Sequence, residues 1–228
     1  MGFTHIKNGV EYTFGDLSVS PWLIDNFATW EPETFDVFEQ IADSNLVAID
    51  IGAWIGTTSV WLSKNFKNVI SVEADPVSVK CLNETLLLSD CRNVTVVPSP
   101  VASKKQDVFF GPRHTDWNES MSYMKQWSTH PKDIIMSTVT FDELLNINIG
   151  PIGFIKCDIE GGEEDIITDL LQYSLDNECP VYLSFHVSWW QNQDISRFRN
   201  LFIQFQGNVE DHIRCDGFCS ILFKKIVL

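Results

Sequence analysis

Two short segments, residues 47–56 and 71–76, constrain the fold of this chain more than any other feature. The first reads Val-Ala-Ile-Asp-Ile-Gly-Ala-Trp-Ile-Gly, an apolar strand that runs into a glycine turn and then a helix. The second reads Ser-Val-Glu-Ala-Asp-Pro and ends a further strand with Glu73, about 20 residues after Gly52. In a doubly wound sheet this spacing places an acidic residue where it accepts hydrogen bonds from ribose hydroxyls. The two segments therefore predict a nucleoside site at the end of a parallel sheet.

The glycine turn differs from the fingerprint of dinucleotide-binding proteins. Its pattern is Asp-x-Gly-x-x-x-Gly, so Asp50 occupies the place of the first glycine in Gly-x-Gly-x-x-Gly. A carboxylate there repels a pyrophosphate, and no Gly-Lys-Ser/Thr follows that would indicate a P-loop. S-adenosylmethionine carries a ribose, an ammonium and a sulfonium but no phosphate, so it fits these charges best. A side chain at Gly52 is expected to collide with this ligand. The residues expected to contact it are Asp50, Gly52, Ala53, Trp54, Gly56, Glu73, Ala74 and Asp158.

Predicted strands alternate with predicted helices along most of the chain. Strands are expected near 46–51, 69–73, 93–98, 152–158 and 181–185. Helices are expected near 32–42, 57–66, 140–146 and 194–205, and after Asp75-Pro76 and Gly161-Gly162. The stretch 207–226 reads as an antiparallel hairpin with a turn at Asp216-Gly217. This order predicts an α/β fold with a Rossmann-like, doubly wound sheet of seven strands, one of them antiparallel.

Two segments lie outside the alternating pattern. Residues 1–30 are expected to form an N-terminal extension with a β-hairpin at Asn8-Gly9, ahead of a domain that spans 31–228. Residues 99–135 show few regular signals apart from a strand near 107–110, and so long an irregular stretch is usually a functional loop. We expect part of it to act as a lid. Candidate contacts to a phosphate or sugar acceptor are Arg113, His114, Trp117, Trp127, Trp189 and Trp190.

The charge of the chain limits its partners. The formal net charge is −15, which argues against nonspecific binding to nucleic acid or anionic lipid, since both require a basic surface. The sequence contains no apolar run long enough for a membrane span and does not begin with a basic region followed by an apolar one. We therefore expect a cytoplasmic protein with a small-molecule or glycan substrate.

Four stretches together resemble the FkbM family of S-adenosylmethionine-dependent methyltransferases. They are residues 48–56, 72–76, 138–144 and 155–163. The last reads Ile-Lys-Cys-Asp-Ile-Glu-Gly-Gly-Glu and is similar to the family's Ile-Lys-x-Asp-x-Glu-Gly-x-Glu block. One departure is that the family often has Glu-x-His after the fifth strand, whereas this chain has Ser184-Phe185-His186. The resemblance implies the class I methyltransferase version of the doubly wound fold.

The candidate catalytic residues are Asp158, Glu160 and His186, which follow two strands expected to be neighbours. A histidine with its ordinary pKa near ~6.5 is a competent base at neutral pH. Either His186 or Asp158 is therefore expected to act as the base, with the other orienting it. The acids at 163–165 are expected mainly to complement the dipole of the helix that they begin. Magnesium bound through Asp158 is an alternative that the sequence does not favour, so we predict no metal ligands.

The resemblance also implies a reaction. Members of the family transfer a methyl group to oxygen, often to sugar hydroxyls of glycans or glycosylated natural products. Two alternatives stay open at this point: a methyltransferase with a non-sugar acceptor such as an amine or a phenol, and a module that binds the nucleoside without turnover. The sequence does not indicate the oligomeric state.

Overall fold

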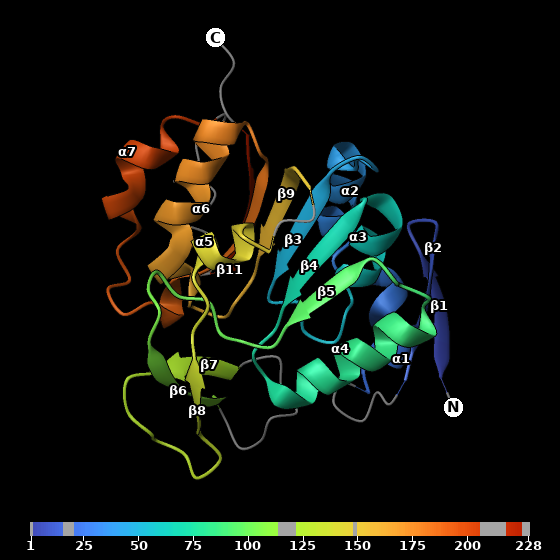
Figure 1. Ribbon diagram of the computed structural model, residues 1–228, viewed down its shortest axis with the longest axis horizontal. Helices are drawn as coiled ribbons and strands as arrows, with labels where there is room; N and C mark the ends of the chain where they lie inside the picture. The colour runs from blue at the N-terminus through green and yellow to red at the C-terminus, as the bar shows by residue number, and fades with distance from the viewer. Residues whose placement is uncertain (1, 16–20, 114–121, 148–149, 206–217, 225–228) are drawn as a thin grey trace.

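The chain folds around a mainly parallel β-sheet (Figure 1). The computed structural model describes residues 2–15, 21–113, 122–147, 150–205 and 218–224. Within these residues the sheet has six strands in the order β11-β10-β9-β3-β4-β5. Their bounds are β3 Val47–Ile51, β4 Asn68–Val72, β5 Val94–Val97, β9 Ile152–Cys157, β10 Val181–His186 and β11 Phe218–Phe223.

The strand order fixes where a ligand can bind. β4 and β5 extend the sheet on one side of β3, whereas β9 and β10 extend it on the other. All of these pairings are parallel, and only β11 runs antiparallel, beside β10. In open α/β sheets the ligand crevice lies at the carboxyl ends of the strands where the order reverses. That point lies between β3 and β9.

Helices cover both faces of this sheet (Figure 1). Successive residues of one strand point to opposite faces, so Ala48 packs in one apolar cluster and Ile49 in the other. The face with Ala48 is covered by α2 (Pro32–Ile41), α3 (Ser59–Asn65) and α4 (Pro76–Leu88). The face with Ile49 is covered by α5 (Phe141–Leu145), α6 (Glu163–Asn177) and α7 (Arg199–Phe202). None of the helices in the described ranges is both long and apolar enough to cross a bilayer.

The predicted N-terminal hairpin is present. β1 (Phe3–Lys7) pairs antiparallel with β2 (Val10–Phe14) across a two-residue turn. Asn8 and Gly9 adopt positive φ values of 45° and 74°, as a tight hairpin turn requires. Phe14 is fully buried and belongs to the apolar cluster that also contains residues of α2, α3 and α4. The hairpin is followed by the short helix α1 (Leu23–Asn26) and a 3₁₀ turn at Phe27–Thr29.

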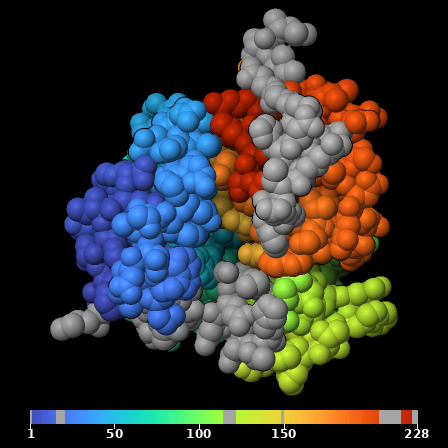
Figure 2. Space-filling model, turned by 180° about the vertical axis from the view of Figure 1, so that it is seen from behind, coloured from blue at the N-terminus to red at the C-terminus, as the bar shows by residue number. Residues whose placement is uncertain are grey.

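The segment 99–135 contains more regular structure than expected: the predicted strand near 107–110 is present, and two further short strands pair with it. Three short strands, β6 (Asp107–Pro112), β7 (Ser122–Lys125) and β8 (Ile134–Ser137), form an antiparallel sheet in the order β7-β6-β8. Figure 2 shows residues 122–137 in yellow-green, gathered next to the C-terminal third of the chain. β7 and β8 have four residues each, too few for a clear alternation of apolar and polar positions. His114 and Trp117 lie outside the described residues.

Two expectations for the C-terminal third also change. The helix expected at 194–205 is a 3₁₀ turn, Ile195–Phe198, followed by the four-residue α7. The Asp194 carboxylate accepts the Ser196 N–H and so caps the start of this turn. Of the hairpin expected at 207–226, the structure describes β11, and residues 206–217 lie outside the described ranges. The count of seven strands therefore stays a prediction.

Candidate active site

A cavity of about 220 Å³ opens at the reversal point of the sheet. Its wall includes Gly52 and Trp54 after β3, Glu73 after β4, and Asp158 after β9. Trp30 and Glu31 from the N-terminal part and Tyr123 from β7 complete it. Five of the predicted cofactor-binding residues line this cavity. They are Gly52, Trp54, Glu73, Ala74 and Asp158.

The backbone conformation at position 52 requires a glycine. The φ of Gly52 is +82°, and an added Cβ would lie 1.8 Å from the carbonyl oxygen of Asp158. The Asp158 N–H in turn donates to the carbonyl of Ile51 at 2.9 Å. The turn after β3 thus passes directly over the end of β9. The expected collision of a side chain at this position is with the chain's own backbone, before any ligand is considered.

Asp50 lies beneath the turn and is fully buried. Its Oδ2 accepts hydrogen bonds from the hydroxyls of Thr58 at 2.8 Å and Ser59 at 2.6 Å. Its Oδ1 lies 3.4 Å from the Lys156 ammonium, which also donates to the carbonyl of Gly52 at 2.8 Å. Asp50 therefore helps to shape the turn. It does not line the cavity, and neither do Ala53 and Gly56, so their contact with a ligand stays a prediction.

Lys156 was not selected from the sequence, although it is the lysine of the Ile-Lys-x-Asp block. It is buried beneath the cavity, with its ammonium 4.0 Å from the Asp158 carboxylate. Burial by itself lowers the pKa of Lys156, but the charges of Asp50, Asp158 and Glu31 outweigh this effect and raise the pKa above its ordinary value. Lys156 is therefore a permanent cation that holds the ends of β3 and β9 together.

Glu73 presents its carboxylate at the rim of the glycine turn. It accepts backbone N–H groups of Trp54, Ala74 and Asp75, each at 2.8 Å. Burial raises the pKa of Glu73 to about 7, although these three hydrogen bonds oppose the increase. The carboxylate is thus fixed in position and has lone pairs left over for ligand hydroxyls.

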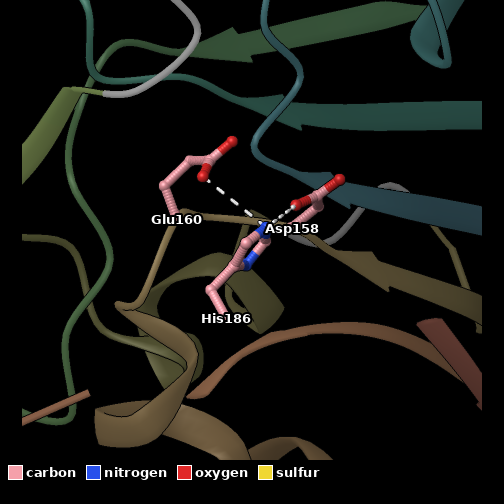
Figure 3. Close-up of side chains that lie close together, drawn as sticks. All are labelled: Asp158, Glu160 and His186. Carbon is pink, nitrogen blue, oxygen red and sulfur yellow. Dashed lines mark ion pairs between the residues drawn. The ribbon is translucent and has the colours of Figure 1, made fainter. Parts of the chain in front are cut away.

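Asp158, Glu160 and His186, which we call the acidic corner, come together as predicted (Figure 3). Figure 3 shows the imidazole pointing between the two carboxylates, with His186 at the end of β10 and both acids after β9. His186 Nε2 lies 3.6 Å from Asp158 Oδ1 and 3.5 Å from Glu160 Oε2. The predicted adjacency of the two strands is also confirmed, because β9 and β10 pair in parallel.

His186 has a buried partner, Glu163, that we did not predict from the sequence. Glu163 is fully buried, and its Oε1 lies 2.6 Å from His186 Nδ1. Its carboxylate also accepts the N–H groups of Ile159 and Gly161 and the indole N–H of Trp190. The expectation that Glu163 mainly complements a helix dipole is therefore wrong. The available signal was the final glutamate of the family block, which is Glu163 itself.

The expectation of an ordinary pKa for His186 is also wrong. Burial by itself lowers the pKa of His186, but Glu163, Asp158 and Glu160 raise it to about 9. The ring is therefore mainly protonated at neutral pH and is a poor base there. Burial raises the pKa of Glu160 to about 7, with the neighbouring carboxylates of Asp158 and Glu163 adding to the effect. The group of this corner that titrates near neutrality is the Glu160 carboxyl.

Aromatic rings and a guanidinium group connect the acidic corner with the three-stranded sheet. The His186 ring stacks on Trp189 with centroids 5.2 Å apart and planes 7° apart. The Arg113 guanidinium lies 4.1 Å from the Trp189 ring and 4.2 Å from that of Tyr123. Arg113 also donates to the carbonyl of Glu160 at 3.0 Å. Trp189 and Arg113 thus contact the acidic corner, and their expected contact with an acceptor stays a prediction, whereas Trp190 is buried.

Comparison with known proteins identifies the type of domain. A model of the methyltransferase FkbM domain matches residues 50–210, which include every residue of the cavity's sheet edge named above. Curated protein sequences give no match.

Two solved structures, both of Streptococcus proteins, show the same fold, and a third is similar to a lesser degree. An rRNA methylase from Streptococcus thermophilus superposes with a TM-score of 0.50 at 10% identity, covering 86% of this chain and 95% of that one. SMU.1697c from Streptococcus mutans, provisionally assigned as a methyltransferase and crystallised with SAH, gives 0.51 at 12% identity, with 85% and 96% covered. Methyltransferase FkbM from Methylobacillus flagellatus KT gives 0.45 at 15% identity, with 81% and 48% covered.

Proposed function

Because this chain belongs to the FkbM family of methyltransferases, we propose that it transfers a methyl group from S-adenosylmethionine to a hydroxyl group, with a sugar of a glycan or glycoconjugate as the acceptor. The observation that carries this proposal is a shared cavity. Asp158 and Glu160 of the acidic corner line the same space as the ribose-binding candidate Glu73. A donor and an acceptor held there would be adjacent.

The cavity fits the nucleoside end of the proposed donor. Glu73 offers fixed acceptor lone pairs at the place where a doubly wound fold binds ribose hydroxyls. Aromatic rings of Trp22, Trp30 and Trp54 line the wall, and such surfaces are usual in small-molecule sites with few polar groups. The acidic groups Glu31 and Asp158 suit an ammonium and a sulfonium. SMU.1697c of Streptococcus mutans, which shares the fold, binds SAH.

The chemistry assigns the chain's residues two tasks. S-adenosylmethionine supplies the methyl group: the acceptor oxygen bonds to the methyl carbon as the carbon–sulfur bond breaks, and its electron pair stays on sulfur. The protein must hold the acceptor hydroxyl in line with that bond, which is a task of positioning. It must also take the hydroxyl proton, because an aliphatic hydroxyl is otherwise a poor nucleophile.

Among the residues of the acidic corner, Glu160 best suits the second task. A base is most effective when its pKa is close to the working pH, and the pKa of Glu160 is raised to about 7. Its Oε2 is buried and accepts no hydrogen bond from the described residues. Asp158 then orients the acceptor, and the protonated His186 balances the charge of both carboxylates. Compared with the sequence-based assignment, the base moves from His186 or Asp158 to Glu160.

Two measurements test the proposal. Thermal-shift assays with S-adenosylhomocysteine and with NAD should show stabilisation by the first alone. Incubation with donor carrying a labelled methyl group should then label a hydroxyl of a glycan in a panel of acceptors. Label on an amine or a phenol alone would show a non-sugar acceptor. Binding with no transfer to any acceptor would indicate a module without turnover.

A further inference from the structure

We propose that the acidic corner is a divalent-cation site, in which Asp158 Oδ1, Glu160 Oε2 and His186 Nε2 are the ligand atoms. Cation binding is inferred from geometry alone, whereas a catalytic role for the cation rests on the proposed function. The three residues follow or end two adjacent parallel strands, and one ligand atom from each lies within 4.8 Å of the others. Asp158 and Glu160 also line the cavity.

The distances suit ligands of one ion better than direct hydrogen bonds. An N–H···O bond spans roughly 2.7–3.2 Å between heavy atoms. His186 Nε2 lies 3.6 Å from Asp158 Oδ1 and 3.5 Å from Glu160 Oε2, beyond that range on both sides. Two atoms bound to one cation at about 2.0–2.2 Å lie roughly 3.0–3.5 Å apart. The gap between the imidazole and the carboxylates is therefore close to the size that a shared cation requires.

Glu160 supplies an independent observation. Its Oε2 is buried and has no hydrogen-bond partner among the residues that the structure describes. The neighbouring guanidinium of Arg113 donates to the Glu160 backbone carbonyl. A buried carboxylate oxygen that accepts no hydrogen bond is costly unless it coordinates a cation. This oxygen is one of the three proposed ligand atoms.

Glu163 provides the outer contact that metal-binding histidines usually have. Its carboxylate lies 2.6 Å from His186 Nδ1, so that nitrogen donates its proton to Glu163 and Nε2 is directed to the corner. A bound cation displaces the proton that Nε2 otherwise carries, and this proton is released to water. Glu163 is itself fixed by the N–H groups of Ile159 and Gly161. The carboxylate–histidine pair is thus rigid and buried, and it orients the imidazole toward the two acids.

The donor set selects the kind of cation. Two carboxylates and one imidazole suit divalent ions that accept mixed oxygen and nitrogen ligands, for which Mn²⁺ is a convenient probe. No thiolate contributes. The acceptor hydroxyl would occupy a further coordination position, where the cation lowers its pKa. It then releases its proton to water, and Glu160 acts as a ligand in place of a base. The bond to the methyl carbon forms, and the carbon–sulfur bond breaks, as in the proposed function.

The test titrates the full chain with Mn²⁺ and follows the loss of the free-ion signal by electron paramagnetic resonance. We expect one ion per chain in the wild type. The Glu160→Gln variant should lose more affinity than the roughly 10–100-fold expected when an outer partner is removed. Glu163→Gln, which removes the outer partner, should lose about 10–100-fold. Asp176→Asn, an exposed acid on α6, is the matched control and should bind Mn²⁺ like the wild type.

Thermal shift with S-adenosylhomocysteine is measured on the same samples. Retained binding in Glu160→Gln shows that the variant is folded and that its loss of Mn²⁺ is local. Wild-type protein that binds S-adenosylhomocysteine but leaves the Mn²⁺ signal unchanged overturns the cation site and leaves the proposed function intact. Equal Mn²⁺ affinity in Glu160→Gln and wild type overturns it as well, because the ion then lies elsewhere. Absence of S-adenosylhomocysteine binding, with Mn²⁺ still bound, instead counts against the proposed function.

Discussion

The carboxylate of Glu163 and the imidazole of His186 form a buried pair, with 2.6 Å between Oε1 and Nδ1. Glu163 begins α6 and His186 ends β10. The contact therefore joins a helix that covers the sheet to the strand that carries the histidine of the acidic corner. The ring of His186 has one orientation as a result. The position of its Nε2 is set by the buried acid and not by whatever binds in the cavity.

Replacing Glu163 by glutamine should weaken the fold as well as the site. The substitution keeps the side chain's shape but removes a charge-assisted hydrogen bond, which contributes about 1.5–3 kcal/mol. Urea unfolding should show a loss of that size. Asp176→Asn removes an exposed charge and should change the free energy of unfolding by less than about 0.5 kcal/mol. Equal stabilities of the two variants would mean that the pair does not support the fold.

Loss of the Glu160 carboxylate should slow methyl transfer without loosening the donor. Glu160→Gln is expected to reduce turnover by ~10²–10⁴, the usual range for a positioned base, while affinity for S-adenosylhomocysteine stays nearly constant. Asp158→Asn should behave in the same way. Steady-state kinetics and calorimetry check the two halves of the prediction. Full turnover in Glu160→Gln would show that another group takes the proton.

A side chain at Gly52 should destabilise the protein before it affects the ligand. In Gly52→Ala the Cβ would lie 1.8 Å from the Asp158 carbonyl oxygen, and the positive φ adds strain. Gly9→Ala is a matched control, because Gly9 has φ +74° but no atom within 4 Å of its added Cβ. The control should cost about 1–2 kcal/mol from backbone strain alone. Gly52→Ala should cost clearly more in thermal or urea unfolding, and equal costs would contradict the close contact.

The affinity for S-adenosylhomocysteine should depend on pH through Glu73. Its pKa is raised to about 7, so the carboxylate is mainly protonated below that pH and ionised above it. The ionised form accepts the stronger hydrogen bonds from ribose hydroxyls, and affinity should therefore rise as the pH increases through about 7. Calorimetry across that range should show the rise in wild type and a flat profile in Glu73→Gln. Glu73→Ala should lose roughly 1.5–3 kcal/mol of binding free energy at high pH.

The raised pKa of Glu73 also affects the free energy of unfolding, which should fall with increasing pH where the affinity rises. Because the folded-state pKa of Glu73 lies above the ordinary 4.5, folding favours its protonated form. Its contribution is fully present below pH 4.5 and is lost as the pH rises through about 7. The unfolding free energy of the ligand-free protein should thus decline less steeply with pH over this window in Glu73→Gln than in wild type.

Replacing Lys7 should weaken both the fold and binding in the cavity, although Lys7 lies in the N-terminal hairpin. Its buried ammonium donates to the carbonyls of Phe27, Ala28 and Trp30 and so fixes the segment that brings Trp30 and Glu31 to the cavity wall. Lys7→Met leaves these carbonyls unsatisfied, each at a cost of about 1–3 kcal/mol where burial is complete. Unfolding and S-adenosylhomocysteine titration should both show losses. Lys80→Met, at an exposed position on α4, should show neither.

The sequence predicts the parts of this fold that repeat simple patterns. The apolar run of β3, the Asn8-Gly9 turn and the Asp75-Pro76 start of α4 each carry their own local signal, and all three are present. The carboxyl ends of β9 and β10 were predicted to meet because parallel neighbours end at one edge. This geometry was enough to bring Asp158, Glu160 and His186 together.

What the sequence did not predict depends on contacts between distant residues. Glu163 looks like any acid in a first helical turn until α6 packs against β10 and buries it beside His186. The raised pKa of His186 follows from that burial and not from the local sequence. Lys156 and Arg113 likewise gain their roles only when the ends of β9 and β6 meet the rest of the site.

The contact of Gly52 with the end of β9 bears on how the protein is made. The glycine turn and the acidic corner come from opposite halves of the chain, and the hydrogen bond from Lys156 to the Gly52 carbonyl spans 104 residues. Contacts of such long range require a long loop of chain to close, and the entropy cost of that closure slows folding. During synthesis, a nascent chain that ends before β9 carries the glycine turn without the strand that holds it. We therefore expect the cavity to be completed late in folding, and binding of S-adenosylhomocysteine to report that the two halves of the sheet have joined.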